Sequence, residues 1–187
     1  MTSAELDDVT FVRAQRGDAA AFRELVLHYQ RPVFALLGRM LARTTLYTSI
    51  EDLAQECFLR VFRALPGFSL AGSAKPSTWI LTIATRLAID QLRRNTPQTA
   101  PLEEIADLAS DESADHLIER RALGESLEKA VAKLSPVYRA VFLLRECHEL
   151  SYEEISQVVG SDIGTVKSRL LRARAALRSA LAGVFHE

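Results

Sequence analysis

The stretch SYEEISQVVGSDIGTVKSRLLRARAAL, residues 151–177, predicts two helices joined by a tight turn. Ser151 and Glu154 have the spacing of a capping box, which marks the start of the first helix. Gly160 ends that helix, because glycine readily adopts the left-handed conformation that closes a helix. Ser161 is the predicted N-cap of the second helix. The stretch therefore predicts a helix-turn-helix.

The second helix of this motif is predicted to be apolar on one side and cationic on the other. At about 100° per residue, the apolar residues that share one side are Ile163, Val166, Leu170, Ala173 and Leu177. The residues on the opposite side are Thr165, Ser168, Arg169 and Arg172. No acidic residue interrupts positions 163–178, whose cations give a local charge of +5. A basic helix alone could be a solvated surface helix, but the capped partner helix and turn favour entry into the DNA major groove.

Composition bounds the remaining possibilities. The chain has 187 residues and a formal net charge of −1, so its positive charge is local and the chain is not a general polycation. Cys57 and Cys147 lie far apart in apolar helical patterns, which predicts buried thiols in a reducing compartment. The start, MTSAELDDVTF, lacks signal-peptide features, and no run approaches the ~18 apolar residues of a membrane span. We expect a cytoplasmic protein without membrane insertion.

Helical periodicity extends over nearly the whole sequence and predicts an all-α protein. The expected helices before the helix-turn-helix cover residues 4–15, 19–42, 50–65, 78–94, 117–134 and 136–147. Between Arg94 and Arg120 there is no Lys or Arg, whereas seven acidic residues and two prolines lie there. We therefore expect two small helical domains, residues 1–95 and 118–187, joined by a flexible acidic linker at 96–117. The linker is either a solvated tether or a segment that lies along a basic channel in a partner.

Four stretches, in this order, carry a resemblance to a known family. They are GDAAAFRELVLHYQRPVFALLGRML (17–41), EDLAQECFLRVFRAL (51–65), STWILTIATRLAIDQLRR (77–94) and LSYEEISQVVGSDIGTVKSRLLRARAAL (150–177). Over nearly its whole length the chain resembles the extracytoplasmic-function (ECF) sigma factors of bacterial RNA polymerase, in the sigma-70 family. The first domain is similar to a sigma-2 domain and the last ~70 residues to a sigma-4 domain with its helix-turn-helix.

The resemblance implies a transcription initiation factor with no catalytic residues and no metal or cofactor of its own. Such a factor binds the RNA polymerase core through the β′ clamp helices and the β subunit. It directs the core to promoter DNA, recognises the −35 and −10 elements and helps to melt the duplex. The resemblance also implies control by a separate anti-sigma factor, and a linker that threads a basic channel of the polymerase.

The helix at residues 51–65 is expected to supply the contact with the polymerase. Its predicted core stripe is Leu53, Cys57, Phe58, Val61, Phe62 and Leu65. Leu59 falls in the middle of the opposite, polar side, as an interface anchor ringed by polar residues would. A scattered exposed leucine is the alternative reading. The resemblance assigns the β′ clamp helices to Asp52, Gln55, Glu56 and Leu59.

The segment from Gly72 to Arg94 is expected to read the −10 element. In the family this region captures an unstacked base, which requires polar groups for the base edge and cations for the backbone. The residues that supply them here are Ser73, Lys75, Ser77, Thr82 and Arg86. Trp79 is expected in the core, not stacked on a base. Arg86 stands where family members often have Asn, so the base preference is expected to differ.

The second helix of the motif is expected to read the −35 element. The positions that the resemblance places against DNA are Lys167, Ser168, Leu171 and Arg172. The expected phosphate contacts are Thr165, Arg169 and Arg174. The helical wheel agrees for Ser168 and Arg172, whereas Lys167 and Leu171 lie on the flank.

Two other classes of protein remain alternatives. One is a helix-turn-helix repressor or activator that binds DNA without polymerase, which would leave the 52–59 face and the basic 75–94 segment without a purpose. The other is a helical enzyme with a carboxylate-bridged metal site. Glu24 and His28, and also Glu112 and His116, have i, i+4 spacing, but the Glu-x-x-His pairs typical of di-iron bundles are missing. The sequence also contains no pattern of zinc ligands.

Overall fold

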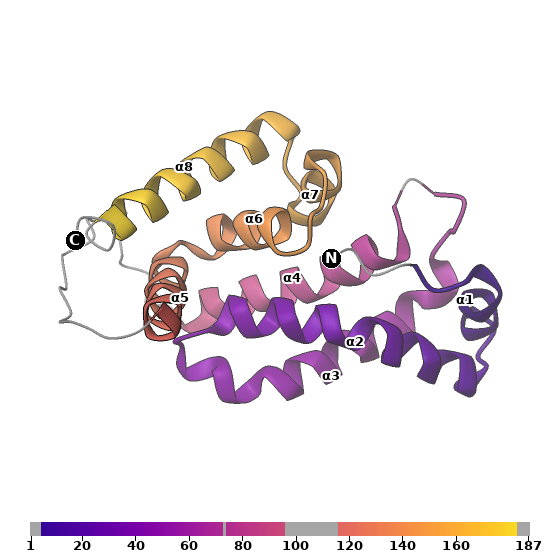
Figure 1. The fold of residues 1–187 in the computed structure, drawn as a ribbon. Coiled ribbons are helices and arrows are strands. Elements are labelled where there is room, and N and C mark those ends of the chain that lie inside the picture. Colours follow the sequence, from indigo (N-terminus) through magenta and orange to yellow (C-terminus); the bar gives the residue numbers. More distant parts are fainter. Residues whose placement is uncertain (1–4, 73, 96–115, 183–187) are drawn as a thin grey trace.

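The chain folds into helices at every regular element that the computed structural model describes, which covers residues 5–72, 74–95 and 116–182. The α-helices are α1 (Asp8–Gln15), α2 (Ala19–Leu41), α3 (Ile50–Ala64), α4 (Pro76–Asn95), α5 (His116–Lys133), α6 (Pro136–Glu146), α7 (Tyr152–Val159) and α8 (Ile163–Leu181) (Figure 1). Two short 3-10 helices, η1 (Thr45–Ser49) and η2 (Leu65–Gly67), flank α3. These ranges contain no strand, and the predicted all-α class is confirmed.

Helix α2 is the centre of the first group of helices and packs against α1, α3 and α4. It begins where Asp18 accepts hydrogen bonds from the N–H groups of Ala20 and Ala21, at 2.9 and 3.1 Å. Its fully buried side chains recur at helical spacing and are Leu25, Tyr29, Val33, Leu36, Leu37 and Met40. This apolar stripe is wide enough to be covered from several sides, which fixes α2 as the core helix of the group.

The second group consists of α5 to α8 and contains the helix-turn-helix as predicted. The Ser151 hydroxyl accepts from the Glu154 N–H at 3.1 Å, and the Glu154 carboxylate accepts from the Ser151 N–H at 2.8 Å, so both halves of the capping box are present. Gly160 closes α7 with φ of +64°. A Cβ there would meet no atom within 4 Å, so the left-handed backbone, and not a lack of space, favours glycine.

The two groups pack directly on each other. Helix α4 contacts α7 and α6, and α2 contacts α6 and α5, so buried residues of both groups form one cluster (Figure 1). A tether between two domains does not by itself predict such packing. Most of the predicted linker lies outside the described residues, and its last two positions begin α5. The domain boundaries remain a prediction.

Three local expectations were wrong. Asp162, and not Ser161, caps α8, because its carboxylate reaches the Thr165 N–H at 2.8 Å. Phe62 is 52% exposed, although its ring meets that of Phe22 in a T-shaped arrangement with 5.0 Å between the ring centres, because the buried stripe of α3 is narrower than its apolar stripe. Cys147 is exposed, since it is the C-cap of α6 and lies beyond that helix's packed face. Cys57 is buried as expected, and burial raises the pKa of its thiol to about 12.

Candidate nucleic-acid interface

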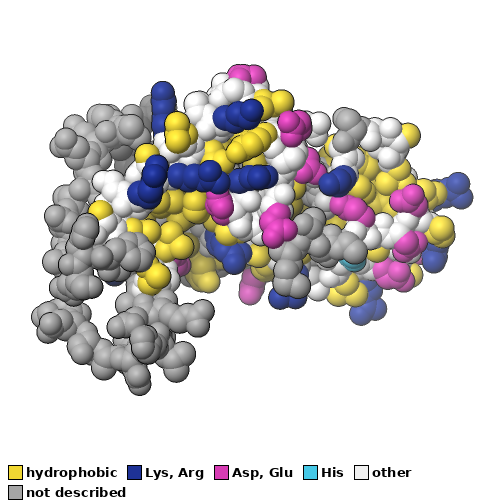
Figure 2. All heavy atoms as spheres, turned by 45° about the horizontal axis from the view of Figure 1, so that its top comes forward, with side chains coloured by type: hydrophobic (Ala, Val, Ile, Leu, Met, Phe, Trp, Pro, Cys, Tyr) yellow, Lys and Arg dark blue, Asp and Glu magenta, His cyan; other side chains and the backbone are white. Residues whose placement is uncertain are grey.

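Helix α8 has a buried back and an exposed front. The buried residues of the back are Val166, Leu170, Ala173 and Leu177. Ser168 and Arg172 are exposed on the opposite side, as the helical wheel predicted. Figure 2 shows Lys and Arg side chains gathered in a row on the face that carries α8. A cationic row on a helix with an anchored back is the geometry that suits a DNA groove.

The N-terminus of α8 is fixed by one carboxylate. Asp162 accepts the Thr165 hydroxyl at 2.6 Å and the Thr165 N–H at 2.8 Å. These hydrogen bonds, the one from the hydroxyl first, lower the pKa of the Asp162 carboxyl below its usual value. The single proton of the Thr165 hydroxyl is therefore donated within the cap, so a phosphate contact by that hydroxyl would have to take this proton from Asp162.

Most cations on α8 have partners outside that helix, on α6, on α7 or in the turn before α8. Arg169 donates to the Ser161 hydroxyl at 2.7 Å, and Arg174 forms an ion pair with Glu146 at 2.6 Å. The Lys167 ammonium lies 5.4 Å from the centre of the Tyr152 ring. The hydrogen bond from Arg172 to the Tyr138 hydroxyl is long, at 3.4 Å. Arg172 is thus held less tightly than Arg169 or Arg174, which suits a side chain that reaches for a base.

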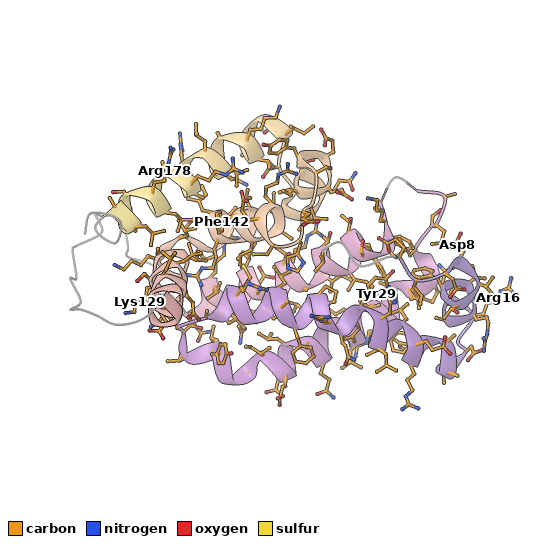
Figure 3. All side chains as sticks on the ribbon, in the orientation of Figure 1. Asp8, Arg16, Tyr29, Lys129, Phe142 and Arg178 are labelled. Atoms are coloured by element: carbon orange, nitrogen blue, oxygen red, sulfur yellow. The ribbon has the colours of Figure 1, made fainter. Side chains whose placement is uncertain are left out.

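Leu171 is 65% exposed and lies at the edge of a shallow apolar groove of about 640 Å³. Leu127 of α5, Phe142 of α6 and several residues of α8 line this groove, and Figure 3 labels Phe142 and Arg178 on it. The sequence did not predict the groove, because it forms only where three helices meet. The only related signal in the sequence was the position of Leu171 on the flank of α8.

The predicted −10 residues that the structure describes lie just before α4 and along the first half of that helix. Lys75 is exposed and forms an ion pair with Glu154 of α7 at 3.2 Å. Ser77 donates its hydroxyl and its N–H to the Glu5 carboxylate. Thr82 is half-buried and donates to the Thr78 carbonyl at 2.8 Å, whereas Arg86 is exposed. Ser73 lies outside the described residues.

Trp79 packs in the protein as expected. Its ring lies 4.7 Å from the ring of Phe68, which in turn lies 5.4 Å from Phe11. The indole thus belongs to an aromatic row between α1, α4 and the loop that precedes α4. This packing holds the start of α4 in place.

Glu154 carries two roles at the junction of α4 and α7. One carboxylate oxygen accepts the Ser151 N–H, and the other accepts the Lys75 ammonium and the Thr78 hydroxyl. Burial by itself would raise the pKa of Glu154, but these partners outweigh burial and lower it. A single carboxylate therefore links the cap of the helix-turn-helix to the start of α4.

The residues predicted to contact polymerase lie on the outer side of α3. Asp52 and Gln55 are exposed, Leu59 is 44% exposed, and Glu56 is half-buried and paired with Arg60 at 2.7 Å. Sequence reasoning missed Phe62 as a surface residue. It stands three positions after Leu59, so the two side chains are neighbours on one exposed helix face.

The described parts of the chain contain neither a metal-binding cluster nor a helix that could cross a membrane. No group of three or more metal-ligating side chains comes together in those residues. None of the helices described is both long enough and apolar enough to cross a membrane.

Comparison with known proteins identifies the family. The sequence matches the family model for Sigma-70 region 2 over residues 25–98 and that for Sigma-70, region 4 over residues 124–177. It is 33% identical over 179 residues to the ECF RNA polymerase sigma factor SigW of Bacillus subtilis, covering 90% of this chain and 93% of SigW. The chain belongs to the ECF sigma factors. The RNA polymerase sigma-H factor of Pseudomonas aeruginosa is 32% identical over 197 residues, covering all of both chains.

Solved structures agree with this ECF sigma factor in fold. CnrH, solved in complex with the cytosolic domain of CnrY, has a TM-score of 0.67 and 22% identity, covering 94% of this chain and 96% of CnrH. The sigma factor RpoE of Bartonella quintana, solved with the anti-sigma factor NepR, has a TM-score of 0.63 and 22% identity, covering 86% and 96%. The predicted polymerase and −10 residues of this sigma factor fall within its region 2 match, and the predicted −35 residues within its region 4 match.

Proposed function

We propose that this ECF sigma factor directs the RNA polymerase core to promoters by reading the −35 element with α8 and the −10 element with the start of α4. The observation that carries the proposal is the anchored, cationic α8, whose exposed Ser168 and Arg172 stand opposite a buried back. The flanking Lys167, Leu171 and Arg174 extend this surface. Thr165 and Arg169 are half-buried, at the edge of the exposed front of α8, and we assign them to phosphate contacts.

The −10 function rests on the chemistry at the start of α4. Lys75 and Arg86 are exposed cations, and Ser77 and Thr82 are half-buried hydroxyls on the same helix. A single-stranded segment needs cations along its backbone and polar groups near its bases. We assign Ser73 to the same set from the sequence alone. The chain itself supplies no covalent chemistry in this proposal, because the polymerase carries the catalytic centre.

Polymerase binding is assigned to the outer face of α3, where Leu59 lies among Asp52, Gln55 and Glu56. An exposed leucine ringed by polar side chains has the composition of an interface anchor. The proposal keeps the domain limits of 1–95, 96–117 and 118–187, with the acidic linker in a basic channel of the polymerase. The likeness in fold to CnrH and RpoE, both solved with a bound protein, supports control by an anti-sigma factor.

Run-off transcription with purified core polymerase tests this proposal. The templates are promoter-bearing genomic fragments, and reactions without the sigma factor are the control. We expect a promoter-specific product that depends on both elements. If no fragment gives such a product, while the purified chain alone binds duplex DNA tightly and specifically, the protein is instead a regulator that acts without polymerase.

Leu59→Asp is expected to weaken binding to core polymerase by roughly 10-fold or more, because truncating an interface anchor typically costs about 2 kcal/mol. Binding is measured by fluorescence anisotropy of the labelled chain titrated with core. The matched control is Val9→Asp on α1, which introduces the same charge at a residue that is 70% exposed. Equal losses for both variants would show that α3 is not the docking face.

A further inference from the structure

The loop between η2 and α4 is held at both of its ends by the N-terminal segment of the chain. Figure 1 shows α1 at the end of the molecule where this loop lies. Three residues of the segment make the contacts, and we call them the brace: Glu5, Phe11 and Gln15. The hydrogen bonds of the brace to the ends of the loop join residues 50 to 72 positions apart. The function proposed above does not by itself require any of these contacts.

The start of the loop is fixed by Gln15 and Phe11. The side-chain amide of Gln15 donates to the Leu65 carbonyl at 3.0 Å and to the Phe68 carbonyl at 2.7 Å. Phe11 is fully buried, and its ring lies 5.4 Å from the ring of Phe68, which lies 4.7 Å from that of Trp79. The chain therefore enters the loop with its backbone hydrogen-bonded and its first side chain packed.

The other end of the loop, where α4 begins, is fixed by Glu5. Lys75 precedes the helix, and its side chain has no acceptor with which to cap it. Pro76 has no N–H, so Ser77 supplies the first free N–H of the helix. The Glu5 carboxylate accepts this N–H at 3.2 Å and also accepts the Ser77 hydroxyl. A residue 72 positions away therefore caps α4, with a negative charge that suits the helix dipole.

The Glu5 carboxylate is itself anchored on the core helix α2. It accepts the Tyr29 hydroxyl at 2.8 Å, and Tyr29 is 1% exposed. The Tyr29 oxygen in turn accepts the Leu6 N–H at 3.1 Å. Burial raises the pKa of Tyr29, so its hydroxyl keeps the proton that it donates. Withdrawal of Glu5 would take away the partner of this buried hydroxyl at a cost in free energy, so the brace is a fixed part of the fold.

Fixed ends bear directly on the proposed −10 reader. A loop with free ends loses conformational entropy when a ligand orders it, whereas a loop ordered by the fold has lost that entropy beforehand. Lys75 and Ser77, two of the proposed −10 residues, lie at the end that Glu5 holds. Ser77 donates its one hydroxyl proton to Glu5, so toward DNA this hydroxyl can only accept a hydrogen bond.

We propose that the brace is a positioning device for the −10 reader, which holds both ends of the loop so that Lys75 and Ser77 meet the −10 strand already ordered. The inference rests on the proposed function for its consequence, but not for its geometry. The brace residues position the reader and do not themselves contact DNA in this proposal. Their contacts described above lie on α2, η2 and α4, so their effect should fall on the −10 element and spare the −35 element.

The test is Glu5→Ala in the full chain, with Asp7→Ala as the matched control. Asp7 lies two positions further on and caps α1, since its carboxylate accepts the Thr10 N–H at 2.9 Å. Each change removes one carboxylate and one helix cap, so we expect similar losses of stability. Urea denaturation checks that the two losses match. Only Glu5→Ala releases the start of α4.

Run-off transcription with core polymerase measures discrimination among −10 sequences and, separately, among −35 sequences. We expect Glu5→Ala to reduce −10 discrimination by roughly three- to tenfold and to leave −35 discrimination within about twofold. Gln15→Ala, at the other end of the loop, should also reduce −10 discrimination, and Asp7→Ala should change neither quantity. The proposal is wrong if Glu5→Ala leaves −10 discrimination unchanged, if it affects both elements equally, or if Asp7→Ala has the same effect.

Hydrogen–deuterium exchange separates this inference from the proposed function. Glu5→Ala should speed exchange of the amides in the first turn of α4, and Asp7→Ala should speed exchange in α1 instead. If exchange at α4 does not change, Glu5 does not hold the loop and the inference fails. If exchange changes as expected but even the unaltered protein does not discriminate among −10 sequences, the brace stands as a structural contact and the proposed −10 function fails.

Discussion

Leu170→Ala is expected to lower the free energy of unfolding by about 2–5 kcal/mol, the range measured for leucine truncations in packed cores. Leu170 is 2% exposed and lies at the centre of the back of α8, where that helix packs on α6. Removal of its side chain leaves a cavity between helices that are held in position by their own neighbours. Urea denaturation followed by circular dichroism measures the change.

Leu171→Ala is the matched control for this prediction. The residue is adjacent in sequence and identical in chemistry, but its side chain is 65% exposed. We expect a change within about 0.5 kcal/mol, as for surface substitutions in general. Similar losses at both positions would mean that α8 has a different rotational setting, and the assignment of its front to DNA would fall with it.

Arg172→Ala is expected to cost about 1–3 kcal/mol at the −35 element and to relax the base preference there. That cost corresponds to roughly 5- to 150-fold in affinity or promoter selectivity. The expectation follows from the exposed position of Arg172 on the front of α8 and from its long hydrogen bond to Tyr138, which leaves the guanidinium available for bidentate contact with guanine. Competition between −35 variants in run-off transcription with core polymerase measures it.

Arg178→Ala controls for the loss of a positive charge. Arg178 is an exposed cation on the same helix but lies outside the predicted −35 set. It should weaken binding slightly and equally across −35 sequences. A second outcome is that Arg172→Ala behaves in the same way and only reduces the slope of log affinity against log salt concentration by about one. In that case Arg172 contacts a phosphate and reads no base.

Local signals in the sequence were enough to predict the helices and the helix-turn-helix. The capping box at Ser151 and Glu154 and the left-handed Gly160 depend on residues within one turn of each other, and both appear in the structure. The N-cap of α8 was misplaced by one residue because Ser161 and Asp162 are both good caps. The choice between them depends on which side chain reaches the Thr165 N–H, and that is a matter of geometry.

The contacts between the two groups of helices could not be predicted in this way. Thr78 and Glu154 are 76 positions apart, and Arg139 and Met40 are 99 apart. Neither pair has a periodic or compositional signal, because Thr78, Glu154 and Arg139 are polar and consistent with a solvated helix, and Met40 takes part only through its backbone carbonyl. Phe62 was placed in the core for a different reason. A helical wheel gives the direction of a side chain but not how far the neighbouring helices extend to cover it.

The Glu154 carboxylate gives the junction of α4 and α7 a defined response to acid. Its pKa is held below the ordinary value of 4.5, so the carboxylate supports the folded chain at all higher pH and loses that role only as pH falls through the lowered pKa. Mild acidification of a cell leaves it charged. At neutral pH the ion pair between Lys75 and Glu154 is therefore broken by competition for one of its two charges, and not by titration.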